Sequence, residues 1–398
     1  MKQSNSLTIL AIETSCDETA IALLKSFNPQ RPRFELLANV VASQIKIHRK
    51  YGGVYPTIAK REHQRNLVPV LEQSLSEAKL LKKSKCQNPN AKSISKIKYQ
   101  ALKEILVREQ MLFERLKNFF RNYQKPKIDI IAVTIGPGLE PCLWVGVNFA
   151  KALSFFWELP VIPVDHMKAH ILANWLSLSN QKSKILFPAV CLVVSGGHTQ
   201  LVLMKNFDQY EIIGETRDDA AGECFDKTAR TLGLPYPGGP AIAAEAAKFN
   251  VRHSKFKIQL PRPMIYSKNY DFSFSGLKTA VLYHFKKQPS KTKRSKKYTR
   301  AMAYEIQKAI NDVLVKKTIR AAKDFRVKTI ILAGGVAANE ELRKKLKIYS
   351  LEAKINFLVP PRKFCTDNAA MIAAAAFFQR KKKKDWQSLE AKANLRIS

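Results

Sequence analysis

A strand, a polar turn and a returning strand occur twice in the sequence, about 180 residues apart. Residues 8–24 form the first copy, and residues 189–204 form the second, whose turn is Ser195-Gly196-Gly197-His198-Thr199. Apolar runs of this length around a polar or glycine turn are typical of paired strands. A third strand-like run, 329–333, leads through Gly334-Gly335 into a helix-like segment at 340–346. Because helix-like segments alternate with these runs, the pattern predicts an α/β protein with two related lobes that face each other across a cleft.

The length of 398 residues, with 46% hydrophobic content, is enough for two cores of ordinary size. We expect an N-terminal lobe over 1–160 with a basic insertion at 79–127, and a C-terminal lobe over 161–370 with a basic loop at 286–300. Residues 371–398 are expected to form a C-terminal helix and a basic tail that can return to the N-terminal lobe.

The apolar runs, the first residues and the cysteines bear on the cellular compartment of the protein. No apolar run approaches the roughly 18 to 20 residues that cross a bilayer, and residues 1–8 are polar, so we expect no membrane span or secretory signal. Scattered cysteines without a CxxC pair favour a reducing cytoplasm. The six are Cys16, Cys86, Cys142, Cys191, Cys224 and Cys365.

The formal net charge of +36 indicates a polyanionic partner, either nucleic acid or an acidic membrane surface. Residues 79–127 carry a net +11, residues 286–300 carry eight basic residues and no acid, and residues 380–384 are all basic. Apolar residues at helical spacing over 99–120 predict a basic amphipathic helix. A solvated surface is the alternative for each stretch alone, and no strongly apolar helix face accompanies the two shorter runs to favour a membrane. Together the three stretches favour phosphate binding. The candidate residues are Lys286, Lys287, Lys293, Arg294, Lys296 and Lys297.

Two histidines four residues apart, His166 and His170, follow the strand-like run 161–164. On a helix this spacing places both imidazoles on one face, as a shared metal requires, although the spacing alone is weak evidence. Asp367, just before the small-residue segment 369–378, is the candidate third ligand, and such a set leaves coordination positions open. The glutamate of the H-E-x-x-H motif is missing, which removes the main support for a zinc protease.

Four carboxylates lie within residues 218–226 of this basic chain. Helix capping and surface ion pairs are one interpretation. The other is that Asp226 and the Gly238-Gly239 turn hold ribose hydroxyls, through carboxylate acceptors and close backbone approach.

Seven motifs in this order resemble the TsaD family, the tRNA N6-adenosine threonylcarbamoyltransferases, formerly labelled O-sialoglycoprotein endopeptidases. They cover nearly the whole chain outside 79–127 and 286–300. The motifs are Ile12-Glu13-Thr14-Ser15-Cys16-Asp17-Glu18-Thr19, Gly136-Pro137-Gly138-Leu139, His166-x3-His170, Ser195-Gly196-Gly197-His198-Thr199, Asp218-Asp219-Ala220-Ala221-Gly222-Glu223, Tyr236-Pro237-Gly238-Gly239-Pro240 and Gly334-Gly335-Val336-Ala337-Ala338-Asn339.

The resemblance implies an actin-like (ribonuclease-H-like) fold and transfer of a threonylcarbamoyl group from threonylcarbamoyl-adenylate to N6 of adenosine 37, in tRNAs that read codons beginning with A. It also implies one divalent metal per subunit, Fe²⁺ or alternatively Zn²⁺, and accessory proteins of the TsaB and TsaE type. By position, His166, His170 and Asp367 resemble the family's metal ligands. The positions that resemble its adenylate site are Val194, Ser195, Gly196, Gly197, His198, Asp226, Gly239 and Asn339.

The sequence identifies no general base. Three positions depart from the family's pattern. Ala243 stands where an acid is common, so that a ribose contact is lost or supplied by Glu245. Lys168 replaces a commonly acidic residue between the histidines, and Glu140-Pro141-Cys142 alters the loop after Gly138. The alternatives to the transferase are a non-catalytic scaffold that binds tRNA or a protein partner, and a metallopeptidase. An intact ligand set disfavours the scaffold.

Overall fold

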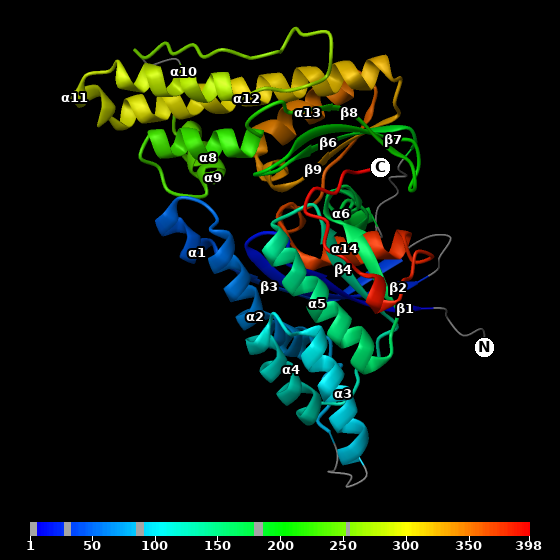
Figure 1. The fold of residues 1–398 in the computed structure, drawn as a ribbon. Helices are drawn as coiled ribbons and strands as arrows, with labels where there is room; N and C mark the ends of the chain where they lie inside the picture. Colours follow the sequence, from blue (N-terminus) through cyan, green and yellow to red (C-terminus); the bar gives the residue numbers. More distant parts are fainter. Residues whose placement is uncertain (1–5, 28–32, 85–90, 179–185, 252–254) are drawn as a thin grey trace. The chain divides into compact units, whose positions relative to one another are not determined.

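The computed structural model describes residues 6–27, 33–84, 91–178, 186–251 and 255–398 (Figure 1). The chain forms two compact units. Unit 1 comprises residues 1–46, 54–181 and 367–396, and unit 2 comprises residues 47–53, 182–366 and 397–398. Each unit is built around one five-stranded mixed sheet.

In unit 1 the strand order is β3-β2-β1-β4-β5. β2 pairs antiparallel with both β1 and β3, while β1, β4 and β5 run parallel. β1 and β4 are buried over most of their length, as expected for apolar strands covered on both faces. The strands are β1 Leu7–Glu13, β2 Glu18–Phe27, β3 Arg33–Ser43, β4 Ile130–Gly136 and β5 Val161–Asp165.

Helices cover the unit 1 sheet. α2 and α5 pack together against the strands, α3 and α4 pack onto α5 and α2, and α14 contacts β1 and β2. The residues of α14 are mostly alanine, and nine of its ten residues are buried. The helices are α1 Ile45–His48, α2 Pro56–Glu77, α3 Ala91–Ile105, α4 Gln110–Asn122, α5 Glu140–Trp157, α6 His166–Leu172, α7 Trp175–Leu178 and α14 Ala369–Phe378.

In unit 2 the strand order is β10-β9-β6-β7-β8. The long helix α12 packs against α9 and β6 and forms much of the apolar core. The strands are β6 Ala189–Val194, β7 Thr199–Met204, β8 Tyr210–Glu215, β9 Thr329–Ala333 and β10 Asn356–Leu358. The helices are α8 Ala221–Thr231, α9 Gly238–Ala247, α10 Ser275–Lys286, α11 Ser290–Lys293, α12 Lys296–Asp324 and α13 Glu340–Glu352.

The two sheets have the same connectivity. β6 pairs antiparallel with β7 and parallel with β9, as β1 does with β2 and β4. The prediction of an α/β protein with two duplicated lobes is confirmed, and the connectivity is that of the actin-like (ribonuclease-H-like) fold.

Several elements differ from the sequence predictions. The single helix expected over 99–120 is two helices, α3 and α4, because a break at 106–109 lets Leu106 and Leu112 both reach the core. The segment expected as a basic loop at 286–300 is mostly helical, since it contains the end of α10, α11 and the start of α12. Residues 161–181, expected in the second lobe, lie in unit 1, because β5 pairs with β4. No helix of the described residues is long and apolar enough to cross a membrane.

Candidate metal centre

Three parallel strands of unit 1 end at the same edge of the sheet. β1 ends at Glu13, β4 at Gly136 and β5 at Asp165. The carboxyl ends of parallel strands are where open α/β sheets bind ligands. α6 begins directly after β5, and the Asp165 carboxylate accepts hydrogen bonds from the N–H groups of Met167 and Lys168, at 2.8 and 3.0 Å. This cap fixes the first turn of α6 at the sheet edge.

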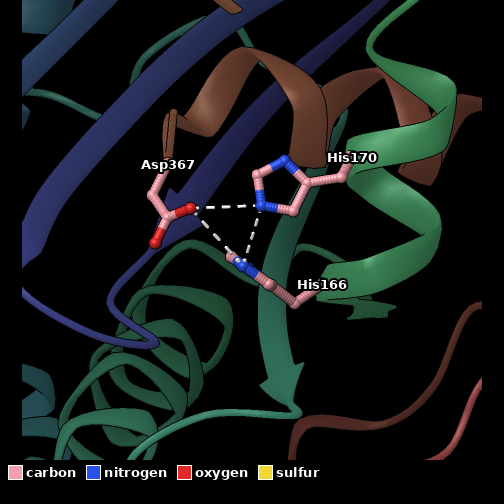
Figure 2. Close-up of side chains that lie close together, drawn as sticks. All are labelled: His166, His170 and Asp367. Atoms are coloured by element: carbon pink, nitrogen blue, oxygen red, sulfur yellow. Dashed lines mark hydrogen bonds and ion pairs between the residues drawn. The ribbon is translucent and has the colours of Figure 1, made fainter. Parts of the chain in front are cut away.

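His166, His170 and Asp367 meet at this edge (Figure 2). The histidines lie one turn apart on α6, and Asp367 directly precedes the capping residue of α14. The two Nε2 atoms are 3.1 Å apart. Oδ1 of Asp367 lies 3.1 Å from Nε2 of His170 and 3.5 Å from Nε2 of His166. The three residues predicted as metal ligands are therefore brought together.

These distances fit a shared ion. Ligand atoms 2.0 to 2.1 Å from a metal in tetrahedral or octahedral geometry lie about 3.0 to 3.4 Å from one another. The two separations of 3.1 Å fall within this range, and the 3.5 Å between His166 and Asp367 lies just above it. Both imidazoles are buried, and the Asp367 side chain is 21% exposed. The cluster can hold a metal.

Glu13 lies behind His166. Its Oε2 is 3.0 Å from Nδ1 of His166 and accepts a hydrogen bond from Thr134 Oγ1 at 2.6 Å, while Oε1 accepts one from Ser15 N–H at 2.5 Å. Glu13 is completely buried. A carboxylate on the second ring nitrogen is the usual support of a metal-bound histidine, because it fixes the tautomer and orientation of the ring.

The electrostatics of the cluster favour positive charge. Burial lowers the pKa of His166, but the charges of Glu13 and Asp367 outweigh burial and raise it well above its usual value. Burial raises the pKa of Asp367, yet His166 and His170 hold it well below its usual range. Burial lowers the pKa of His170. A divalent cation would supply the positive charge that this set of carboxylates stabilises.

Sequence reasoning assigned no role to Glu13, Ser15 or Thr134. The available signal was an acidic residue at the end of an otherwise apolar strand, since a buried carboxylate needs a partner. The glycine loop after β4 supports the same group of residues. A Cβ atom on Gly138 would lie 2.7 Å from the Ser15 carbonyl oxygen, and that oxygen accepts a hydrogen bond from Leu139 N–H at 2.8 Å.

In unit 2, the turn between β6 and β7 contains the candidate substrate residues 195–198. Ser195 N–H donates to the His198 carbonyl at 2.8 Å, and His198 N–H donates to Ser195 Oγ at 3.1 Å. No atom lies within 4 Å of a Cβ built on Gly196 or Gly197, and both residues are exposed.

The Gly334 turn packs against the end of β6. Gly334 has φ of +87°, and a Cβ there would lie 2.4 Å from the Val194 carbonyl oxygen. Glycine is required by both the close approach and the left-handed backbone. The structure thus brings the predicted Val194 and Gly334 regions together within unit 2.

Three of the four clustered carboxylates have structural partners. Asp218 accepts hydrogen bonds from the hydroxyls of Ser273 and Ser275, both at 2.6 Å, at the start of α10. Asp219 pairs with Lys227 and Lys278, each at 2.9 Å. Glu223 also pairs with Lys227, at 2.7 Å. Hydrogen bonding at the start of α10 and ion pairing therefore explain Asp218, Asp219 and Glu223.

Asp226 and Asn339 both accept hydrogen bonds from backbone N–H groups of unit 2. Asp226 Oδ1 accepts a hydrogen bond from Gly238 N–H at 2.6 Å, and burial raises the pKa of this carboxyl. Asn339 Oδ1 accepts one from Leu342 N–H at 3.0 Å, which caps α13. The Gly239 backbone also hydrogen-bonds Asp226, and a Cβ built on Gly239 would come no nearer than 4.0 Å to the Phe225 side chain.

Two departures from the family pattern also have partners. Lys168 is buried, and its charge lowers the pKa of the neighbouring Asp165 carboxyl against the larger effect of burial. Glu245, weighed as a replacement for an acid at position 243, pairs with Lys248 at 2.6 Å and with Arg300 at 3.3 Å.

A family model described as TsaD: tRNA N6-adenosine threonylcarbamoyltransferase matches residues 35–85 and 111–374 of this chain. The chain belongs to the TsaD family. It is an enzyme of that family, a transferase that acts on tRNA.

Individual TsaD proteins are similar along almost the whole chain. The tRNA N6-adenosine threonylcarbamoyltransferase of Syntrophomonas wolfei is 44% identical over 366 residues, which are 92% of this chain and 90% of the relative. That of Thermosipho africanus is 43% identical over 392 residues, which are 98% of this chain and 100% of the relative. The crystal structure of full-length HypF in the phosphate- and nucleotide-bound form superposes with a TM-score of 0.50 at 12% identity, over 96% of this chain and 56% of HypF. That likeness concerns the fold alone.

Proposed function

We propose that this TsaD protein transfers the threonylcarbamoyl group of threonylcarbamoyl-adenylate to N6 of adenosine 37, in tRNAs that read codons beginning with A. The observation that carries the proposal is the convergence of His166, His170 and Asp367 within 3.1 to 3.5 Å, in a chain that belongs to this family. A scaffold that only binds tRNA or a protein partner needs no such ligand set.

We assign His166, His170 and Asp367 to one divalent metal, Fe²⁺ first and Zn²⁺ as the alternative. Two imidazoles and one carboxylate are ligands that both ions accept, and they leave positions open for a substrate. A bound divalent ion supplies a Lewis acid that polarises a carbonyl or phosphoryl oxygen. Glu13 holds the His166 ring so that Nε2 faces the ion.

The adenylate is assigned to unit 2 residues. Gly196 and Gly197 are exposed, and the backbone N–H groups of a glycine turn suit phosphate oxygens. The ribose is assigned to Asp226 and Gly239, since a Cβ on Gly239 would meet no atom closer than 4.0 Å. The remaining residues of the assigned adenylate site correspond by position to the family's site, and they are Val194, Ser195, His198 and Asn339. The Asn339 side chain already caps α13, so we expect its contribution to be the placement of the Gly334 turn.

The acceptor amine belongs to a base of the anticodon loop. An RNA base that reacts must be unstacked and presented singly. We assign the phosphate contacts near it to the exposed lysines and arginines at both ends of α11. As in the family, we expect accessory proteins of the TsaB and TsaE type, a separate enzyme that makes the adenylate, and a cytoplasmic location.

A metallopeptidase is the weaker alternative. The turn of α6 between the histidines carries Met167, Lys168 and Ala169, so it offers no general base at the position used by H-E-x-x-H enzymes.

The test is mass analysis of tRNA nucleosides from cells depleted of this protein. We expect threonylcarbamoyladenosine to fall on depletion and to return with the wild-type gene. The variant H166A/H170A should not restore it, and its purified protein should have lost bound metal. A control variant, K205A/K344A, changes two exposed side chains of unit 2 and should restore it fully. Unchanged nucleoside levels on depletion would refute the transferase, as would full restoration by the double histidine variant.

A further inference from the structure

Two basic stretches that are far apart in the sequence meet on unit 1. Lys98 of α3 and Lys384 of the C-terminal segment line the same surface hollow of about 480 Å³. α3 lies in the stretch 86–110, which the family model does not match, so this helix is an addition to the family core. The C-terminal segment is held in place because the backbone of Lys384 pairs antiparallel with that of Val161 at the start of β5.

Partly buried aromatic residues fix the walls of the hollow. Trp386 packs edge-on against Phe155 of α5, with ring centroids 5.4 Å apart. On the other side, Tyr99 and Lys98 of α3 pack on Phe156, the next residue of α5. The added helix and the tail therefore both lie beside the end of α5, and each contributes a lysine to the hollow.

The charge around the hollow is predominantly positive. We define the α3–tail patch as the two lysines that line the hollow, Lys98 and Lys384, together with Lys125, whose charge acts on Glu158, and Lys381 and Lys383, which precede Lys384 in the exposed tail. Glu158 pairs with Lys98 at 2.6 Å, and the hydrogen bond from Lys98 and the charge of Lys125 lower the pKa of its carboxyl. Asp385 also lines the hollow.

The tail lysines of the patch are available to a partner. Lys381, Lys383 and Lys384 are exposed, and within the described part of the chain no carboxylate pairs with them. Two acids face five lysines, so the patch retains a net positive charge that an anionic partner can neutralise.

The patch lies away from the metal centre. The residue before α5, Leu139, donates its N–H to Ser15, whose Oγ is 3.3 Å from Nδ1 of His166. The patch adjoins the other end of α5, at Ser154–Glu158. An α-helix of 18 residues is about 27 Å long. An anionic partner that contacts both the metal centre and the patch must span the length of α5. An extended polyanion can do so, whereas the adenylate and a single flipped base are too short.

We propose that the α3–tail patch binds the phosphodiester backbone of tRNA outside the anticodon loop. The proposal rests on tRNA being the substrate of the proposed function. Lysines that neutralise phosphates release counterions, so they add affinity without sequence preference and make binding dependent on salt. The added helix thereby extends the RNA-binding surface of this enzyme beyond that of the family core.

The test compares two variants of the full chain with the same change of net charge. The patch variant is K125Q/K381Q/K383Q/K384Q. The control is K308Q/K323Q/K344Q/K347Q, whose four lysines are exposed on α12 and α13 of unit 2. The dissociation constant for full-length tRNA is measured against salt concentration, with circular dichroism to confirm that both variants are folded.

We expect the patch variant to bind tRNA about tenfold more weakly at low salt, and its slope of log affinity against log salt to fall by roughly 3, since each phosphate contact contributes about 0.9. The control should keep the wild-type slope. Equal losses in both variants would overturn the proposal, because net charge alone would explain them. Unchanged tRNA affinity in the patch variant would also overturn it.

The competing partner is an acidic membrane, because α3 exposes Ile97 and the turn after it exposes Val107, each 75% accessible. Sedimentation with phosphatidylserine vesicles should not distinguish the patch variant from wild type. Loss of vesicle binding together with unchanged tRNA affinity would assign the patch to lipid instead.

Formation of threonylcarbamoyladenosine by the wild-type enzyme is measured in parallel. Its absence would count against the proposed function, whereas the binding comparison decides the patch.

Discussion

The Glu13 carboxylate lies 3.0 Å from Nδ1 of His166, on the side of the imidazole away from Asp367. Glu13 ends β1 and His166 begins α6, so two parallel strands of unit 1 place a buried carboxylate directly behind a metal-ligand candidate. Thr134 on the strand between them completes the arrangement with a 2.6 Å hydrogen bond to the same carboxylate oxygen.

Glu13→Gln should weaken metal binding by about 10- to 100-fold, the usual cost of losing such a partner. The amide has only one acceptor oxygen, so it cannot accept hydrogen bonds from Ser15 N–H, Thr134 and His166 together. Metal content after dialysis against a graded chelator measures the effect. Glu35→Gln, at an exposed position of β3, is the control and should bind metal like wild type. Equal metal retention in both variants would contradict the role of Glu13.

Asn339→Ala should destabilise the protein by about 1 kcal/mol, because it removes the acceptor that caps α13. Asn339→Asp keeps the oxygen acceptor and loses only the donor to Gln307 Oε1, so it should be destabilised less than the alanine variant. Urea unfolding of both variants tests this. Equal destabilisation by alanine and aspartate would show that the cap is not what Asn339 contributes.

Lys317 should make stability depend on pH above neutrality. It is fully buried, its Nζ donates to Ser267 Oγ at 2.8 Å, and burial lowers its pKa from 10.5 to about 8. Between these two values the unfolded chain binds more protons than the folded one, so stability rises with pH across this window. The melting temperature of wild type relative to Lys317→Met should therefore increase from pH 8 to pH 10.5. A parallel comparison with Lys308→Met, at an exposed position, should show no such increase. A constant difference between wild type and Lys317→Met would contradict the shifted pKa.

The cluster of His166, His170 and Asp367 could be predicted from sequence, because each residue follows a recognisable strand or precedes a small-residue helix. The repeated strand–turn–strand pattern likewise predicted two related lobes, and the two sheets have the same connectivity. Glu13 could not be assigned a role, because its partner is 153 residues away and only the parallel pairing of β1, β4 and β5 brings the two together. The α3–α4 hairpin was mistaken for one helix, because apolar spacing continues across the break at 106–109. Periodicity does not indicate where a helix reverses direction.

The basic residues around α11 should contribute to tRNA binding, and substitution tests them better than deletion. Removing residues 286–297 would shorten α10 and α12 next to Tyr298, which is fully buried and whose hydroxyl lies 3.0 Å from His284 Nδ1. The variant K286Q/K287Q/K296Q/K297Q changes only exposed side chains and leaves this packing intact. We expect it to weaken tRNA binding about tenfold at low salt and to flatten the salt dependence, since phosphate contacts release counterions. Filter binding of tRNA at several salt concentrations measures both, with the four-lysine control on α12 and α13 for comparison. If affinity and salt slope match those of the control, the segment is a solvated surface that tRNA does not contact.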